Sequence, residues 1–173
     1  MKKIFLKTKE IIIIPIRHNL LLDNLKFNLI TKSLLNEKYL FLFEYNKHNY
    51  FKDKNKIKKN SVYYLVKKLE NLNIKYSFID TEAKKQNDLF IRKVTWTELF
   101  SLYLFSFFNN KNRVLIKNKF PLFYKYILED REMIMIKKIK EKLISSNKNL
   151  VIIIGEIHCQ ELFNKINLLK NAL

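Results

Sequence analysis

Two of the three histidines in this chain stand at similar places, shortly after a run of β-branched residues. Residues 11–18 read IIIIPIRH and residues 151–158 read VIIIGEIH. In each segment a buried strand is followed by a small or rigid residue, two further residues and then a histidine, His18 or His158. Imidazole nitrogens bind divalent metals and transfer protons near neutral pH. The pattern therefore favours a metal site or an acid–base site.

Carboxylates accompany these histidines at the ends of apolar runs. Glu44 ends the run 39–43, Asp80 ends the run 74–79, and Glu156 lies between Gly155 and His158. The carboxyl ends of parallel strands meet at one edge of a sheet, where ligands bind in folds of this kind. Two histidines and a carboxylate at neighbouring strand ends are suited either to hold a divalent metal or to form a general acid–base set.

Strands that alternate with helices must position these side chains. Continuous apolar runs predict strands buried on both faces, and helical spacing of apolar residues predicts the segments between them. The predicted strands are 11–14, 39–43, 74–79 and 150–154; the predicted helices are 20–35, one that begins at Ser61, 96–108 capped by Thr95, 120–145 and 161–169. Residues 114–116 are ambiguous. The alternation predicts one α/β domain over residues 1–173, with a mainly parallel β-sheet flanked by helices.

The chain contains a single glycine, Gly155. This composition excludes a glycine-rich phosphate loop and a GxGxxG dinucleotide fingerprint. We expect Gly155 to form a sharp bend after its strand with a positive φ, which glycine adopts at little cost. Pro15, in the matching place of the first segment, is expected to fix φ instead.

The net charge is +18, from 34 Lys and Arg against 16 Asp and Glu. Such a charge attracts polyanions. However, only four of the basic residues are arginines, and the lysines are scattered along the chain. We therefore favour a solvated lysine surface over a nucleic-acid interface. One cysteine excludes an intrachain disulfide, and no apolar stretch is long enough to span a bilayer. These features predict a cytoplasmic protein without a membrane span.

With these motifs the sequence resembles the TraB family (TraB/PrgY/Tiki type), which is related more distantly to the ChaN and erythromycin-esterase groups. The family pattern is a GxxH motif after the first strand, an acidic residue at the end of the next strand, an arginine on a late helix, and a second GxxH after a late strand. Here these read PIRH ending at His18, LFLFE ending at Glu44, EDREMIMIKKIKEKL carrying Arg131, and GEIH ending at His158. Pro15 replaces the first glycine.

The resemblance implies a compact α/β fold with one site around both histidines, Glu44 and Arg131. It implies a metal-dependent hydrolase of peptidase type, in which His18, Glu44 and His158 hold a divalent metal. Glu44 or Glu156 would act as general base, and Arg131 would stabilise an oxyanion or bind a substrate carboxylate. Two alternatives remain open: a non-enzymatic protein of the same fold that binds a peptide, a small molecule or haem, and a basic nucleic-acid-binding protein.

Overall fold

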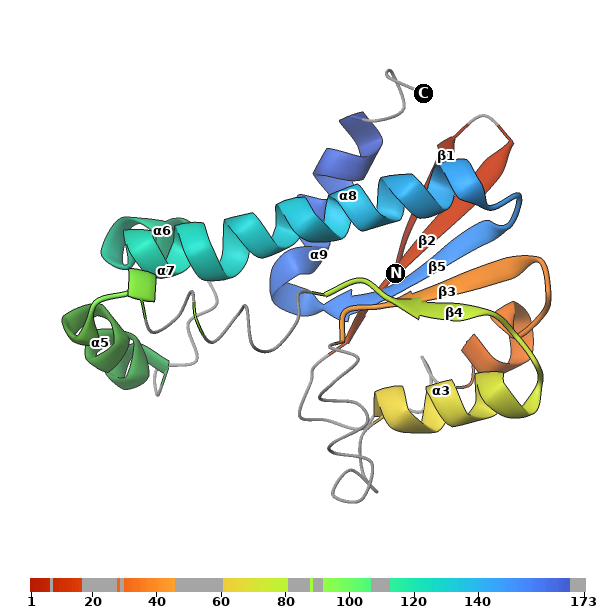
Figure 1. Cartoon of the computed structure of the whole chain (residues 1–173), viewed down its shortest axis with the longest axis horizontal. Coiled ribbons are helices and arrows are strands. Elements are labelled where there is room, and N and C mark those ends of the chain that lie inside the picture. Colours follow the sequence, from red (N-terminus) through yellow and green to blue (C-terminus); the bar gives the residue numbers. More distant parts are fainter. Residues whose placement is uncertain are drawn as a thin grey trace.

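The computed structural model centres on a five-stranded mixed sheet with the strand order β1-β2-β5-β3-β4 (Figure 1). Strand β1 is antiparallel to β2, whereas β2, β5, β3 and β4 are parallel to one another. The predicted α/β fold with a mainly parallel sheet is therefore confirmed. The structure describes the residues 1–6, 8–16, 28, 30–45, 61–80, 88, 92–106 and 113–168. The strands are β1 (Lys2–Leu6), β2 (Lys9–Ile16), β3 (Tyr39–Phe43), β4 (Tyr76–Phe78) and β5 (Asn149–Gly155).

Helices cover both faces of this sheet (Figure 1). The first face packs against α8 (Asp130–Ser145) and α9 (Glu156–Leu168), whose apolar residues join Ile11, Ile13 and Ile152 in one core. The second face packs against α3 (Ser61–Asn71) and the π-helical turn η1 (Ile30–Leu34), which meet Ile12 and Ile14. Successive strand residues point to opposite faces, so a run such as 11–14 must be apolar throughout.

A group of short helices lies beyond the carboxyl ends of the strands, at the left of Figure 1. It contains α5 (Trp96–Ser106), α6 (Arg113–Lys119) and α7 (Pro121–Phe123); the π-helical segment η2 (Tyr124–Glu129) then leads into α8. Thr95 caps α5 as predicted, because its Oγ1 accepts a hydrogen bond from the Glu98 amide at 3.3 Å. Within the described residues, no helix has both the length and the apolarity needed to cross a membrane.

Several element boundaries differ from the prediction. Strand β1 was not predicted, the strand expected over 74–79 shortens to β4, and residues 114–116 belong to helix α6. Residues 20–27 and 29 of the helix expected over 20–35 lie outside the described residues. Residues 30–34 of that segment form η1. Helix α9 begins at Glu156 rather than at Glu161.

The predicted bend at Gly155 is wrong. No glycine among the described residues has a positive φ, and Gly155 is the last residue of β5, where it pairs with Ile16 of β2. Pro15 lies within β2 opposite Ile154, so the two similar segments are offset by one residue in the sheet. Pairing between β1 and β2 ends at Ile13. Among the described strands, Pro15 therefore has a neighbour on one side only, as proline in a sheet requires.

Candidate functional site

The carboxyl ends of β3 and β5 lie side by side at the centre of the sheet, and polar residues follow both strands. The helix after β3, α3, packs on one face, whereas the helix after β5, α9, packs on the other. The connections diverge between these two strands. Such a divergence is where open α/β sheets bind their ligands.

Glu44 directly follows β3 and is 4% exposed. Its Oε2 accepts a hydrogen bond from the backbone amide of Gly155 at 2.6 Å, and its Oε1 accepts one from Nη2 of Arg131 at 3.0 Å. This carboxylate therefore connects β3 with the end of β5 and with helix α8.

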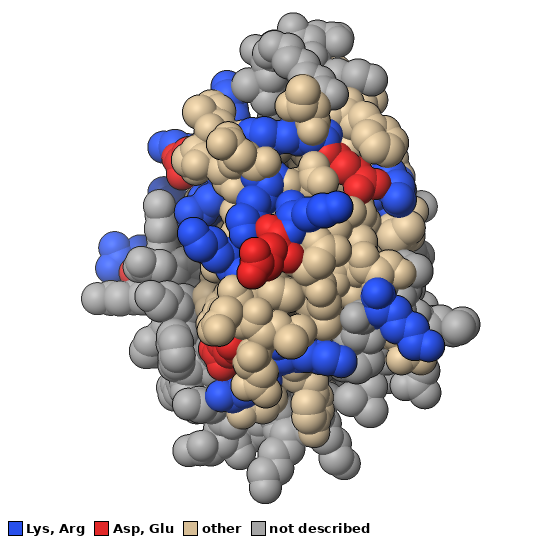
Figure 2. Space-filling model, turned by 90° about the vertical axis from the view of Figure 1, so that its right-hand side faces the viewer, with Lys and Arg blue, Asp and Glu red and all other residues tan. Residues whose placement is uncertain are grey.

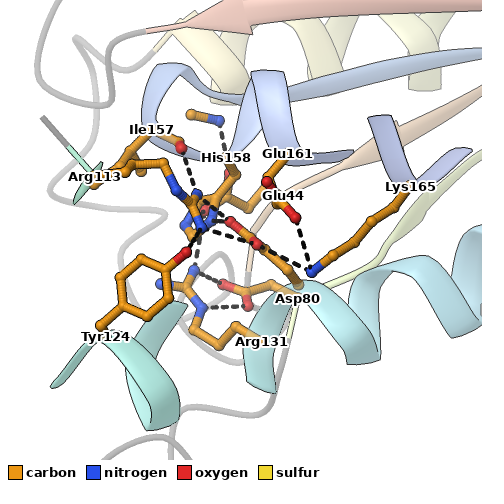
Figure 3. Close-up of polar contacts among 11 residues, drawn as sticks. Glu44, Asp80, Arg113, Tyr124, Arg131, Ile157, His158, Glu161 and Lys165 are labelled. Carbon is orange, nitrogen blue, oxygen red and sulfur yellow. Dashed lines mark hydrogen bonds and ion pairs between the residues drawn. The ribbon is translucent and has the colours of Figure 1, made fainter. Parts of the chain in front are cut away.

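His158 is the third residue of α9 and is 2% exposed. Its Nδ1 lies 2.7 Å from Oε1 of Glu132, and its Nε2 lies 3.4 Å from Oε1 of Glu44 (Figure 3). Each ring nitrogen thus faces a buried carboxylate, one from α8 and one from the end of β3. A carboxylate on Nδ1 orients an imidazole ring, so Nε2 is the nitrogen of His158 that could transfer a proton.

Arg131 holds Asp80 with two parallel hydrogen bonds, from Nε to Oδ1 at 3.0 Å and from Nη2 to Oδ2 at 2.7 Å. Burial lowers the pKa of Arg131, but the neighbouring Asp80 and Glu44 carboxylates outweigh burial and raise that pKa above its usual value. The guanidinium is therefore a fixed positive charge beside Glu44.

Glu132, the next residue on α8, has no exposed surface. Both of its oxygens accept hydrogen bonds from Arg113 of α6, and Arg113 also donates to the backbone carbonyl of Ile157 at 2.8 Å and to the hydroxyl of Tyr124 at 3.2 Å. Burial raises the pKa of Glu132, but the hydrogen bonds with His158 and Arg113 outweigh burial and bring that pKa below its usual 4.5. Glu132 is accordingly an anion when it contacts His158.

Six side chains form one connected set, which we call the ion-pair cluster. Its members come from the ends of two parallel strands, β3 and β4, and from helices α6, α8 and α9: Glu44, Asp80, Arg113, Arg131, Glu132 and His158. Consecutive residues of a helix point about 100° apart, so one turn of α8 directs Arg131 toward Asp80 and Glu132 toward His158. The arrangement supplies a proton-transfer group next to a fixed cation.

Three of the residues proposed from the sequence lie together in this cluster, namely Glu44, Arg131 and His158. His18 lies outside the described residues, and its place in the site stays a prediction. Glu156 begins α9 and is half-buried; its role as general base also stays a prediction. Asp80 stood among the strand ends noted in the sequence, but no role was assigned to it.

Sequence reasoning missed Glu132 and Arg113. A signal for Glu132 exists, since it precedes Met135 and Ile139 at helical spacing on the buried side of α8. A charged residue in that row needs a buried partner. Arg113 carries no comparable signal, because its partner lies 19 positions later in the sequence and is reached only through the packing of α6 against the site.

The described residues of the cluster do not by themselves fit a metal ion. Among them, no group of three or more His, Cys, Asp or Glu is placed to hold one. Both oxygens of Glu44 already accept hydrogen bonds, and the Arg131 guanidinium lies 3.0 Å from one of them. A cation in that place repels a second cation. Since His18 lies outside the described residues, the divalent metal expected at His18, Glu44 and His158 stays a prediction.

A groove of about 700 Å³ lies elsewhere, near the amino end of β4 and the C-terminal end of α8. Its basic lining residues are Lys75, Lys142 and Lys148. The nearby Lys9 donates hydrogen bonds to the carbonyls of Leu143 and Ser146 at the end of α8. Cations are stabilised at a helix C-terminus, which gives lysines at this end a structural role.

Figure 2 shows the side of the molecule that lies at the right of Figure 1. On this side the Lys and Arg side chains lie in several separate groups, and acidic side chains interrupt the largest group (Figure 2). A nucleic-acid interface needs a connected basic surface, and the described residues on this side of the molecule do not form one.

Comparisons with known proteins add no assignment. No family model matches the chain, and no curated protein or solved structure is significantly similar to it. The resemblance to the TraB family rests on the sequence motifs alone and stays a prediction.

Proposed function

We propose that this chain is a TraB-like hydrolase that cleaves a peptide or a small carbonyl compound by acid–base chemistry at the ion-pair cluster. One observation carries the proposal: His158 is held by a buried carboxylate on Nδ1, while its Nε2 faces Glu44 beside the Arg131 guanidinium. The order of the motifs along the chain, which resembles the TraB family, supports it.

In the proposed reaction, Nε2 of His158 takes a proton from a water molecule as that water attacks the substrate carbonyl carbon. Glu132 stabilises the imidazolium that forms, through its contact with Nδ1. The same Nε2 then gives its proton to the leaving amine or alcohol. The carbon–heteroatom bond breaks in this step, and the carboxylic acid product is released.

Arg131 would stabilise the negative charge that develops on the carbonyl oxygen. A positive charge fixed in advance by Asp80 and Glu44 needs no reorganisation during the reaction, which is the most effective form of electrostatic catalysis. Glu44 and His158 are almost fully buried, so the site must open before a substrate can reach Nε2 of His158.

The test compares wild-type protein with His158→Gln, using p-nitrophenyl acetate and fluorescein-labelled casein as probes. Gln keeps hydrogen-bonding groups at this position but cannot transfer protons, so we expect kcat/KM to fall by about 100-fold or more. Glu10→Gln is the matched control, because Glu10 is a partly buried carboxylate in β2 that bonds Lys3 and Tyr39 instead. This control should keep the wild-type rate.

Three outcomes would contradict this proposal. Equal rates in wild type and a folded His158→Gln would remove His158 from the chemistry. Activity that is lost with EDTA and restored by zinc would show that a metal completes the site, as the sequence motifs predict. A wild type that cleaves neither probe, but binds a peptide with an affinity that His158→Gln lowers, would favour the non-enzymatic binder.

A further inference from the structure

Helix α5 carries a row of exposed aromatic side chains. Trp96 is 82% exposed, Phe100 64% and Tyr103 62%. Their spacing of four and three residues places them on one side of the helix. We call this row the α5 aromatic face. Large aromatic residues gathered on one exposed surface mark a contact with another molecule or with a membrane.

The orientation of α5 is fixed by its other side. Glu98 is buried, and its Oε1 accepts a hydrogen bond from the backbone amide of Phe123 in α7 at 3.1 Å. The only acidic residue of α5 therefore points into the protein. In Figure 1, α5 forms the outer end of the helical group.

The chain on both sides of α5 is rich in basic residues and poor in acidic ones. From position 92 to position 123 the sequence contains one acidic residue, Glu98, and six basic residues: Arg92, Lys93, Lys111, Arg113, Lys117 and Lys119. Of these, Arg113 is paired with the buried Glu132. Arg92 and Lys93 are exposed one turn before Trp96, and Lys117 and Lys119 are exposed on α6. An aromatic surface with basic neighbours is complementary to an anionic surface that also has an apolar layer.

We propose that the α5 aromatic face binds the surface of an anionic membrane. Tryptophan and tyrosine favour the boundary between headgroups and acyl chains, and lysine and arginine near them are attracted to anionic lipids. Helix α5 has 11 residues and is about 16 Å long, roughly half of the 30 Å hydrocarbon core. It therefore lies in the plane of the interface instead of crossing the membrane.

A second copy of this chain is the less favourable occupant of the same face. Pairing two copies through α5 would bring two basic helical groups together, within molecules that each carry a net charge of +18. Like charges placed against each other disfavour association. An anionic membrane reverses the sign of that interaction. This inference does not rest on the proposed hydrolase function.

Trp96 is the only tryptophan of the chain, so intrinsic tryptophan fluorescence reports on this surface alone. We expect vesicles of phosphatidylcholine with phosphatidylglycerol to shift its emission to shorter wavelength, and pure phosphatidylcholine vesicles to shift it much less. Brominated acyl chains in the anionic vesicles should quench it. Added salt should weaken the binding, because the attraction to the lipids is partly electrostatic.

The double variant Phe100→Ser with Tyr103→Ser keeps the fluorescent reporter and removes most of the aromatic surface. We expect its affinity for anionic vesicles to fall by about tenfold or more. The matched control is Ile144→Ser on α8, which removes a side chain that is 66% exposed at a different place. This variant should bind like the wild type.

Two results would overturn the proposal. One is the absence of an emission shift and of quenching in the wild type with anionic vesicles. The other is an emission shift that appears without vesicles, grows with protein concentration and accompanies a dimer in sedimentation, since a second copy would then cover α5. The wild-type quenching experiment needs no variant, so a folding defect in the double variant does not affect it.

Discussion

Glu132 is the residue on which the ion-pair cluster depends most. It is fully buried, and its two oxygens contact Arg113 and His158. Removing its charge leaves the Arg113 guanidinium without its buried counter-charge, and breaking such a pair typically costs 3–5 kcal/mol. We expect Glu132→Gln to lower the free energy of unfolding by about 3 kcal/mol at neutral pH, measured by urea denaturation. Glu10→Gln again serves as control and should cost about 1 kcal/mol.

The difference in stability between the wild type and Glu132→Gln should depend on pH in a defined way. The pKa of Glu132 is lowered in the folded state, so its contribution to stability is complete above the unfolded value. That contribution is lost as the pH falls through the folded pKa. The stability difference between wild type and Glu132→Gln should therefore stay constant down to about pH 4.5 and shrink below it. A difference that persists unchanged in acid would show that Glu132 is not the ionised partner.

For single residues, the sequence predicts the site residues that directly follow a strand. It does not predict the site residues that a packed helix brings to the sheet edge. Glu44 and His158 follow buried runs directly, so the rule for parallel strand ends places them at one edge. Arg131 was found through the family motif. The helical spacing of Glu132 with Met135 and Ile139 marks it as buried, but its partners, and the place of Arg113, depend on how α6 and α8 pack over that edge, which no local pattern in the sequence encodes.

The junction between β5 and α9 is the element that sets the position of His158. Gly155 ends the strand and Glu156 begins the helix without an intervening loop. Gly155 is buried, and its amide donates to Glu44. Gly155 does not have a positive φ. We infer that a glycine is needed here because Glu44 and Ile16 lie close to the Gly155 backbone.

The substitution Gly155→Ala tests whether close packing around Gly155 is what requires a glycine. The backbone conformation admits alanine, so the cost arises from placing a methyl group in a packed region. We expect the free energy of unfolding to fall by about 1–3 kcal/mol, measured by urea denaturation. Unchanged stability would mean that the region between Gly155, Glu44 and β2 has room for a Cβ atom.

Among the elements, the sequence predicts the strands that are buried on both faces and fails at the margins of the sheet. The runs in β2, β3 and β5 are apolar throughout because helices cover both of their sides. Strand β1 alternates buried with more exposed residues and contains two lysines, and β4 has only three residues. Edge strands of this kind carry a weak apolar signal.

The net charge of +18 acts on the whole molecule. Mutual repulsion among the basic residues destabilises the compact state. Raising the ionic strength from about 0.01 M to 0.15 M shortens the Debye length from about 30 to 8 Å and screens this repulsion. We expect the melting temperature, followed by circular dichroism, to rise by about 2–4 °C. A fall would indicate that exposed ion pairs contribute more than the repulsion.

The strand order has a consequence for how the chain is made. Strand β5 lies between β2 and β3 and contributes to the cores on both faces, yet it follows the other four strands in the sequence. During synthesis, β2 and β3 leave the ribosome before their common neighbour exists. Until it does, their unpaired backbone edges and apolar faces can associate with other chains. Insertion of the central strand β5 is accordingly the step that completes the sheet. Before this step the chain exposes the most apolar surface that chaperones could bind.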